Sequence, residues 1–289
     1  MVDTLNKNPI SSTARQKNFD VLIVGQGLAG SLLAWELLQQ GVRTMVIDNH
    51  HQGSSSMVAA GIINPITGHR INLTEHFEDY LSVAKDTFAA IHKMLQPQND
   101  FFFEIAQLRL IKNPGQQGYF EQRLEQENYQ KFLEAYKQNL SDTRLRSNSI
   151  VKNQSAEQLV FRQPGYGIAQ IKHSYQVDTM ALLACLEQWL VSQLAFIKTK
   201  LDYQQIKFTA GGIEYQSDEQ LLHAKKIIFC EGYQAIHNPW LKSLPFKLAK
   251  GDILTVETDH AITSMLNWGQ WLLPSNSVNV GINLSLIHI

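Results

Sequence analysis

The sequence predicts an α/β fold whose first domain is built on a parallel sheet, and three features near the start of the chain support this. Val21 to Val24 form a short apolar run, typical of a parallel strand covered on both faces. A glycine-rich turn follows, and Leu28 to Leu38 then show the helical spacing of Leu, Ala and Trp. After a helix stop at Gly41, a second apolar strand runs from Arg43 to Asp48.

The turn contains Gly25, Gly27 and Gly30, which have the spacing G-x-G-x-x-G. The first glycine permits the tight turn, the second lets a pyrophosphate approach the backbone, and the third lets helix and strand pack closely. The helix begins at Leu28 and Ala29, where unpaired N–H groups and a partial positive charge favour phosphate binding. We therefore predict a site for the paired phosphates of a dinucleotide.

The second strand ends on an acid, Asp48, roughly 20 residues after the first glycine, as the dinucleotide-binding pattern requires. Such a carboxylate binds the ribose hydroxyls, so it favours a free 2′-hydroxyl over a 2′-phosphate. The glycine spacing alone also occurs in unrelated α/β proteins. Here strand, turn, helix, strand and acid all agree, which makes the pattern more specific.

The composition is that of an ordinary globular protein. With 289 residues, 44% of them hydrophobic, the chain is long enough for about two domains. Its formal charge of -1 gives no overall electrostatic reason to expect nucleic acid or an anionic membrane as partner. Cys185 and Cys230 lack metal-site spacing, so we expect reduced thiols and no metal. No secretory signal or membrane span is predicted, and a cytoplasmic location is the default.

Apolar periodicity predicts the remaining elements. We expect helices over 74–95, 119–139 and 178–193, and strands over 101–111, 168–171, 196–201, 204–209, 213–215, 226–232, 250–257 and 271–274. The strand over 226–232 is fully apolar until it ends in glycine, so it is expected to return to the nucleotide domain.

Several separated segments, in order, resemble the FAD-dependent oxidoreductases of the D-amino-acid oxidase and glycine oxidase family (DAO) over most of residues 19–283. The matching segments are Gly25 to Gly30, Asp48, Ser54 to Gly61, Val177 to Asp178, Ile227 to Gly232, Pro245 to Gly251 and Trp271 to Pro274. The resemblance implies a Rossmann-like FAD-binding domain with an inserted α+β substrate domain built on an antiparallel sheet.

The family architecture implies that both domains are discontinuous. We expect the FAD-binding domain at 18–80 and 170–240, the substrate domain at 81–169 and 241–283, and a disordered tail at 1–17. Residues 284–289 depart from the family pattern and match the translation of a transposon end sequence used in sequencing libraries. We therefore expect them to be a non-native tail on a C-terminally truncated chain.

The resemblance also implies which residues contact FAD besides the glycine turn and Asp48. In the family, the serine and small-residue loop after the acidic strand contacts the phosphates and lies against the flavin. This carries over to Ser54, Ser55, Ala60 and Gly61, and a second turn near the cofactor carries over to Gly232.

The implied chemistry is oxidation of a carbon–nitrogen bond in an amino acid or related amine, with hydride transfer to the flavin and oxygen or a quinone as electron acceptor. Such a reaction depends on alignment over the flavin more than on a catalytic dyad. An arginine is the expected anchor for a substrate carboxylate, and Arg70 is the first candidate. His69, His173 and Tyr175 are weaker ones.

Two alternatives stay open. Ala60 to Pro65 is similar to a loop in the FAD domain of the bifunctional enzyme that matures 5-methylaminomethyl-2-thiouridine, which oxidises a glycine-like side chain on a tRNA wobble uridine. The balanced charge argues against the large RNA footprint that such a substrate requires. The other alternative is a nucleotide-binding relative without catalysis, including an NAD-binding module.

Overall fold

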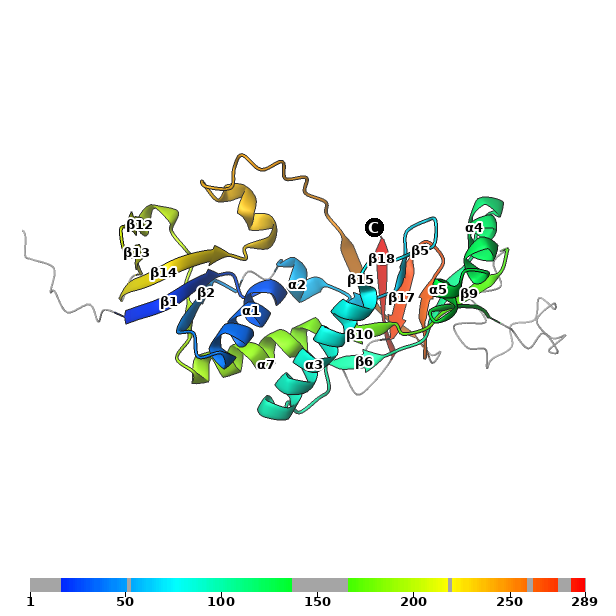
Figure 1. The fold of residues 1–289 in the computed structure, drawn as a ribbon, viewed down its shortest axis with the longest axis horizontal. Helices are drawn as coiled ribbons and strands as arrows, with labels where there is room; N and C mark the ends of the chain where they lie inside the picture. The colour runs from blue at the N-terminus through cyan, green and yellow to red at the C-terminus, as the bar shows by residue number, and fades with distance from the viewer. Residues whose placement is uncertain are drawn as a thin grey trace, which may run out of the picture. The chain divides into compact units, whose positions relative to one another are not determined.

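The computed structural model describes residues 17–50, 53–136, 166–217, 220–258, 262–274 and 282–288. The chain divides into two compact units, and each contains two stretches of sequence (Figure 1). Unit 1 runs to Val58 and resumes over Leu183–Leu248, whereas unit 2 comprises Ala59–Leu182 and the chain from Ala249 onward.

Unit 1 is built on one six-stranded sheet in the order β11-β2-β1-β14-β13-β12. The strand β1 (Lys17–Val24) pairs in parallel with β2 (Thr44–Asp48) and with β14 (Leu221–Phe229), and β11 (Phe196–Lys198) extends the parallel part beyond β2. The hairpin of β12 (Ile206–Thr209) and β13 (Gly212–Gln216) joins antiparallel to β14. The predicted parallel sheet and the return of the third apolar strand are confirmed.

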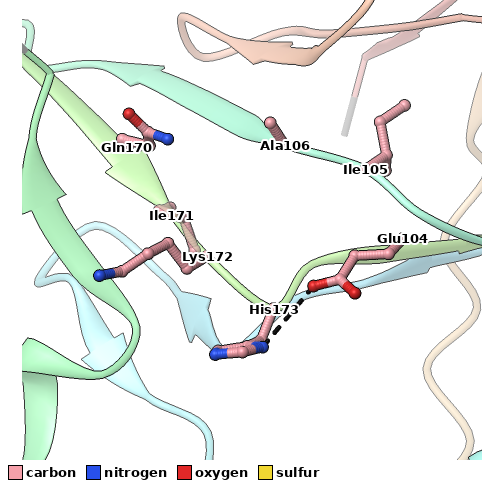
Figure 2. A pocket seen from close by; sticks show the side chains of 7 residues that line it. All are labelled: Glu104, Ile105, Ala106, Gln170, Ile171, Lys172 and His173. Carbon is pink, nitrogen blue, oxygen red and sulfur yellow. Dashed lines mark ion pairs between the residues drawn. The ribbon is translucent and has the colours of Figure 1, made fainter.

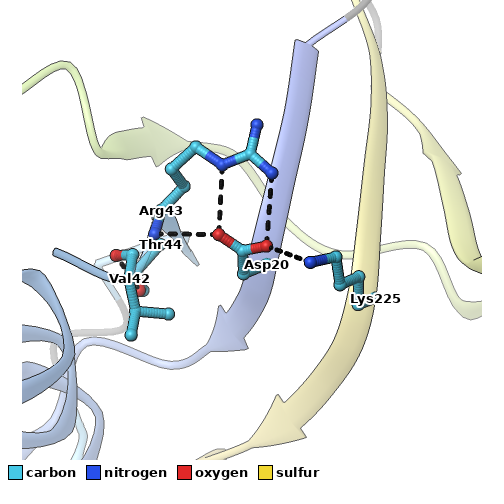
Figure 3. A network of polar contacts seen from close by, with 5 residues as sticks. All are labelled: Asp20, Val42, Arg43, Thr44 and Lys225. Carbon is cyan, nitrogen blue, oxygen red and sulfur yellow. Dashed lines mark hydrogen bonds and ion pairs between the residues drawn. The ribbon is translucent and has the colours of Figure 1, made fainter.

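A carboxylate on β1 ties three adjacent parts of this sheet together (Figure 3). Arg43, which precedes β2, binds Asp20 through Nε at 3.0 Å and through Nη2 at 3.2 Å. The Nζ of Lys225, on β14, lies 2.7 Å from Oδ1 of the same carboxylate. These contacts lower the pKa of the Asp20 carboxyl well below its usual range, chiefly through the Arg43 and Lys225 side chains.

Helix α1 (Leu28–Gln39) follows β1 directly and buries Gly30, Ser31, Ala34 and Trp35. The Trp35 ring packs against that of Trp189, with centroids 4.7 Å apart, in helix α7 (Thr179–Ser192). Two short 3-10 helices, η2 (Tyr203–Gln205) and η3 (Gly232–His237), flank the ends of β12 and β14. The short helix α2 (Ser55–Val58) ends the first stretch of unit 1.

Unit 2 contains a seven-stranded sheet in the order β15-β18-β17-β16-β7-β9-β8. All its pairings are antiparallel except that between β16 and β7. The strands are β7 (Gln107–Leu110), β8 (Leu133–Ala135), β9 (Ile168–Ile171), β15 (Asp252–Thr258), β16 (Met265–Asn267), β17 (Trp271–Pro274) and β18 (Ile282–His288). Residues 284–288, predicted as part of a non-native tail, lie in β18.

The other elements of unit 2 are short, apart from one long helix. A three-stranded sheet has the order β3 (Ile62–Ile63), β10 (Tyr175–Val177) and β6 (Phe102–Glu104). The strands β4 (Ile66–Thr67) and β5 (Asn72–Leu73) form a hairpin. The helices are α3 (Phe77–Leu95), α4 (Pro114–Leu124) and α5 (Glu127–Gln130). Ile66, Ile71, Phe77 and Ile171 belong to the main apolar core of this unit.

Two predictions about unit 2 differ from the structure. The strand expected over 101–111 is two strands, because β6 pairs with β10 whereas β7 pairs with β9 and β16. The helical region expected over 119–139 ends before β8, whose pairing with β9 overrides local helix preference. The compact units divide after Val58, Leu182 and Leu248. The predicted domain bounds at 80, 169 and 240 stay a prediction. Residues 1–16 of the predicted tail lie outside the described residues.

Candidate functional site: a glycine turn at the carboxyl end of a parallel sheet

The turn between β1 and α1 has room for glycine alone at two positions. Gly25 has φ +104°, and a Cβ there would lie 2.4 Å from the carbonyl oxygen of Cys230, just after β14. A Cβ on Gly30 would lie 1.9 Å from the carbonyl oxygen of Gly25. The chain therefore passes from strand to helix with its backbone against β14, as the predicted roles of these glycines require.

The second glycine of the motif, Gly27, is the N-cap of α1 and has no side chain to cap the helix. Ser56 supplies the cap instead, because its Oγ accepts a hydrogen bond from the Leu28 N–H at 3.1 Å. A Cβ on Gly27 would lie 3.0 Å from this same Oγ. The start of α1, where Leu28 and Ala29 were predicted to bind phosphate, is thus joined to the serine loop.

Ser54, Ser55 and Ser56 have different positions within that loop. The Ser54 Oγ accepts weakly from the Met57 N–H at 3.4 Å, and Ser55 is exposed as the first residue of α2. The sequence interpretation assigned Ser54 and Ser55 to the cofactor and missed Ser56. Three consecutive serines give no internal signal for which of them faces the helix.

Asp48 lies at the carboxyl end of β2, and the structure brings it to the glycine turn. Its Oδ2 accepts from the Gln26 N–H at 2.8 Å, and its Oδ1 accepts from the His50 N–H at 2.5 Å. Each carboxylate oxygen can accept a further hydrogen bond, so the acid is positioned without being saturated. The Gly25 N–H also donates to the carbonyl of Ile47 at 2.8 Å, which fixes the turn on the end of β2.

Ala60 and Gly61, predicted to lie against the flavin, belong to unit 2. Gly61 has φ +66°, and a Cβ there would lie 1.9 Å from the carbonyl oxygen of Val177. The Val177 N–H donates to the carbonyl of Gly61 at 2.9 Å, and the Gln176 amide donates to that of Ala60 at 3.4 Å. The segment is therefore held along β10, and glycine is required at 61 for this close approach.

Gly232 starts η3 with φ +55° and is exposed. The preceding Glu231 accepts from the Tyr203 hydroxyl at 2.5 Å and from the Asn238 side-chain amide at 2.8 Å. Burial raises the pKa of the Tyr203 hydroxyl, and the hydrogen bond to Glu231 raises it further. The Glu231 carboxylate thus stabilises the segment around Gly232, and sequence reasoning did not identify its two partners.

Arg70 and His69, the first substrate-anchor candidates, are both exposed in the turn between β4 and β5. Gly68, with φ +69°, begins this turn. His173 and Tyr175 lie elsewhere in unit 2, at the connection from β9 to β10 and within β10.

His173 borders a pocket of about 320 Å³ together with Gln170, Lys172 and Glu104 (Figure 2). Its Nδ1 lies 3.6 Å from Glu104 Oε1, and its φ of 55° is in the left-handed region. Lys172 Nζ donates to Glu134 Oε2 at 3.1 Å. The Lys172 ammonium and the His173 ring thus each lie beside a carboxylate, and neither side chain is buried.

Tyr175 is 3% exposed and stacks on Phe102 with ring centroids 5.0 Å apart. The Lys85 Nζ lies 4.6 Å from the centre of the Tyr175 ring. Within the described parts of the chain its hydroxyl has no hydrogen-bond partner. The ring therefore belongs to the packing between β6, β10 and α3.

Arg109 on β7 is a buried charge that the sequence interpretation missed. It is 9% exposed, and its Nη2 donates to the carbonyl of Gly68 at 2.8 Å. Burial lowers the pKa of the guanidinium. The signal was present, because Arg109 stands between Leu108 and Leu110 in a predicted strand, where a charge is unusual.

Unit 1 thus defines a dinucleotide-binding α/β protein, in which a glycine turn, a capping serine and an acid meet at the carboxyl end of a parallel sheet. The sequence model of the FAD dependent oxidoreductase family (DAO) matches residues 20–281, and the chain belongs to this family. Its cofactor is FAD. No helix in the described ranges combines the length and apolar character that a membrane crossing requires.

Solved structures with a similar fold include two oxidases and a deaminase of low sequence identity. Glycine oxidase from Geobacillus kaustophilus has a TM-score of 0.68 at 14% identity, and the match covers 93% of this chain and 70% of that chain. Iminodiacetate oxidase from Chelativorans sp. BNC1 has a TM-score of 0.65 at 14% identity, covering 92% and 71%. L-amino acid deaminase from Proteus vulgaris has a TM-score of 0.65 at 12% identity, covering 93% and 61%.

The residues of the turn fit an FAD. A Cβ on Gly27 would lie 3.0 Å from Ser56 Oγ. The Leu28 N–H donates to this oxygen, and the other N–H groups of the first turn of α1 have no intrahelical acceptor and can bind a phosphate. Asp48 Oδ2 accepts from the Gln26 N–H at 2.8 Å, and the carboxylate oxygens can still accept hydrogen bonds from ribose hydroxyls.

Proposed function

We propose that this chain binds FAD at the β1–α1 turn and oxidises the carbon–nitrogen bond of an amino acid or related amine. The observation that carries the proposal is the bonded arrangement of Asp48, the glycine turn and Ser56, in a chain of the FAD dependent oxidoreductase family. The similar solved structures include glycine oxidase, L-amino acid deaminase and iminodiacetate oxidase, which supports this substrate class, and they also include an L-alpha-glycerophosphate oxidase.

The chain's own groups have separate tasks in this proposal. The backbone N–H groups of Gly27, Ala29 and Gly30 bind the pyrophosphate, while that of Leu28 donates to Ser56, and Asp48 binds the adenosine ribose. Ser54 and Ser55 border the phosphates, and Ala60, Gly61 and Gly232 lie near the flavin. When bound, FAD would supply the acceptor for the hydride, with its two electrons, that leaves the substrate carbon. Water then hydrolyses the imine product, and oxygen or a quinone takes the electrons onward.

The proposal is tested with the full chain in two stages. Titration with FAD, followed by calorimetry and by the flavin absorbance bands, should show binding at a single site. Anaerobic addition of glycine, sarcosine, proline or D-amino acids should then bleach the flavin absorbance. Failure to bind FAD contradicts the cofactor assignment, and FAD binding without bleaching by any amine contradicts the reaction.

A third stage distinguishes the small-molecule proposal from the alternative in which the substrate is a modified uridine of tRNA. Salt-dependent retention of the FAD-loaded chain on tRNA, together with no bleaching by free amino acids, would favour a modified nucleoside as substrate. Bleaching by a free amino acid and no retention supports the small-molecule proposal.

A further inference from the structure

The carboxylate of Asp48 is held by two backbone groups, one at each oxygen. Its Oδ2 accepts from the Gln26 N–H at 2.8 Å, and its Oδ1 accepts from the His50 N–H at 2.5 Å. The terminal torsion of an aspartate is soft, so a carboxylate bonded through one oxygen can still turn, whereas one bonded through both has a fixed orientation. The direction of its remaining lone pairs therefore depends on where Gln26 and His50 are placed.

The side chains of these two residues both reach helix α7. Gln26 is 8% exposed, and its Nε2 donates to the carbonyl of Leu183 at 3.1 Å. His50 Nε2 lies 3.1 Å from Glu187 Oε1, an ion pair when the imidazole is protonated, although the two atoms lack hydrogen-bond geometry. Residues four apart in a helix lie one above the other on the same face. One face of α7 thus holds both residues whose N–H groups bind Asp48.

His50 also has a backbone conformation that its side-chain contacts stabilise. Its φ of 53° lies in the left-handed region, which residues with a Cβ adopt rarely. Its ring stacks on that of Phe196 in β11, with centroids 5.5 Å apart and planes 25° apart. Because β11 pairs with β2, the ring is held against the strand next to the one that ends at Asp48. The contacts with β11 and α7 therefore stabilise the turn in which the His50 N–H faces the carboxylate.

We propose that Gln26 and His50 are positioning residues, through which helix α7 sets the orientation of the ribose-binding carboxylate. This inference rests on the proposed function. Each residue acts through the N–H that it places on Asp48, and neither side chain needs to touch the ribose. The affinity of the chain for the sugar hydroxyls then depends on α7, whereas its affinity for the phosphates does not.

The test isolates the ribose hydroxyls by comparing ADP with 2′,3′-dideoxy-ADP, which has the same adenine and phosphates. Calorimetric titrations of the full chain with FAD, in the presence of each competitor, give the affinities of both. Wild type should prefer ADP by about tenfold or more, as expected for hydroxyls bonded to a charged group. Asp48→Ala should abolish the preference.

Three variants test the positioning residues. His50→Ala removes the ring and the ion pair. Glu187→Gln removes only the charge of the partner on α7, and Gln26→Met keeps the volume but loses the amide donor. Each should lower the preference for ADP to about threefold or less and leave the affinity for dideoxy-ADP within about twofold of wild type. The double variant of His50→Ala and Glu187→Gln should be no worse than His50→Ala, because the two side chains act as one unit.

His223→Ala is the matched control. His223 Nδ1 lies 3.5 Å from Glu214 Oε1, and this pair belongs to the same unit. The side chains of His223 and Glu214 are 26% and 34% exposed, against 27% and 32% for His50 and Glu187. His223 lies near the amino end of β14, at the opposite end of the sheet from the glycine turn. This variant should keep the wild-type preference for ADP.

The outcomes separate this inference from the proposed function. A wild-type preference for ADP in His50→Ala and Glu187→Gln overturns the inference, and the role of Asp48 stands. Equal weakening of ADP and dideoxy-ADP in these variants also overturns it, because that result means a general loosening of the turn. If His50→Ala does not fold, Glu187→Gln decides, since it keeps the size of the side chain. If wild type binds both nucleotides equally, the ribose contact of Asp48 in the proposed function fails, and this inference fails with it.

Discussion

At the scale of single residues, Gly30 shows how tightly the nucleotide turn is packed. Its missing Cβ would lie 1.9 Å from the Gly25 carbonyl oxygen, so Gly30→Ala must push helix and strand apart. We expect a loss of about 1–3 kcal/mol in the free energy of unfolding, and a weaker affinity for FAD. Urea unfolding and FAD titration measure the two effects.

The matched control for Gly30→Ala is Gly118→Ala. Gly118 is exposed in α4, and a Cβ there would meet nothing within 4 Å. Alanine should therefore be neutral or stabilise α4 by up to about 1 kcal/mol. Equal effects of the two substitutions would show that packing at the turn is not what requires glycine.

A second residue-scale prediction concerns acid stability. The pKa of Asp20 is lowered in the folded state, chiefly by Arg43 and Lys225, so the unfolded chain takes up this proton first as the pH falls. The stabilisation is therefore present above the unfolded pKa of about 4 and is lost at lower pH. Urea midpoints at pH 7 and pH 3 should differ more for wild type than for Asp20→Asn. Asp86→Asn, at an exposed site on α3, should retain the wild-type difference.

At the scale of elements, the start of helix α1 depends on a residue from another helix. Ser56→Ala removes the acceptor of the Leu28 N–H, and we expect a loss of about 1 kcal/mol in unfolding free energy, as for other N-cap deletions. Thermal and urea unfolding measure the change. Ser82→Ala, on the exposed face of α3, is the control and should not destabilise. A Ser56→Ala protein as stable as wild type would contradict the capping role.

Local sequence signals predicted unit 1 better than unit 2. The strand, turn, helix and acid of the nucleotide site are contiguous or nearly so, and their periodicities indicate their structure directly. By contrast, β6, β8 and β10 are three-residue strands whose partners lie far away in the chain. Nothing in three residues specifies such a pairing, since it depends on tertiary contacts.

The same distinction applies to the site residues. Gly25, Gly27, Gly30 and Asp48 lie where their spacing predicted, on one turn and the adjacent strand end. Arg70 and Arg109 cannot be ranked by spacing, because the exposure of each depends on how the β4–β5 hairpin packs on β7. Burial is a property of the folded chain, so only the structure separates the two.

At the scale of the whole molecule, FAD should stabilise the folded chain through binding to unit 1. A ligand that binds only the folded state adds about 2.7 kcal/mol at a free concentration 100 times its Kd. Calorimetric melting should shift upward with FAD, and hydrogen exchange should slow in β1, β2 and α1. Riboflavin lacks the phosphates and adenosine that the turn binds, so an equal shift with riboflavin would contradict the assigned site.

Cys230 lies beside the same turn, with its Cβ 3.3 Å from where a Cβ on Gly30 would be. Burial raises the pKa of its thiol, and Glu231 raises it further, so little thiolate exists at neutral pH. Iodoacetamide should modify Cys230 slowly, and more slowly again once FAD shields the turn. Peptide mass mapping, with Cys185 as internal reference, would follow this rate. The rate at which iodoacetamide modifies Cys230 therefore reports, without any introduced label, whether the glycine turn has bound its dinucleotide.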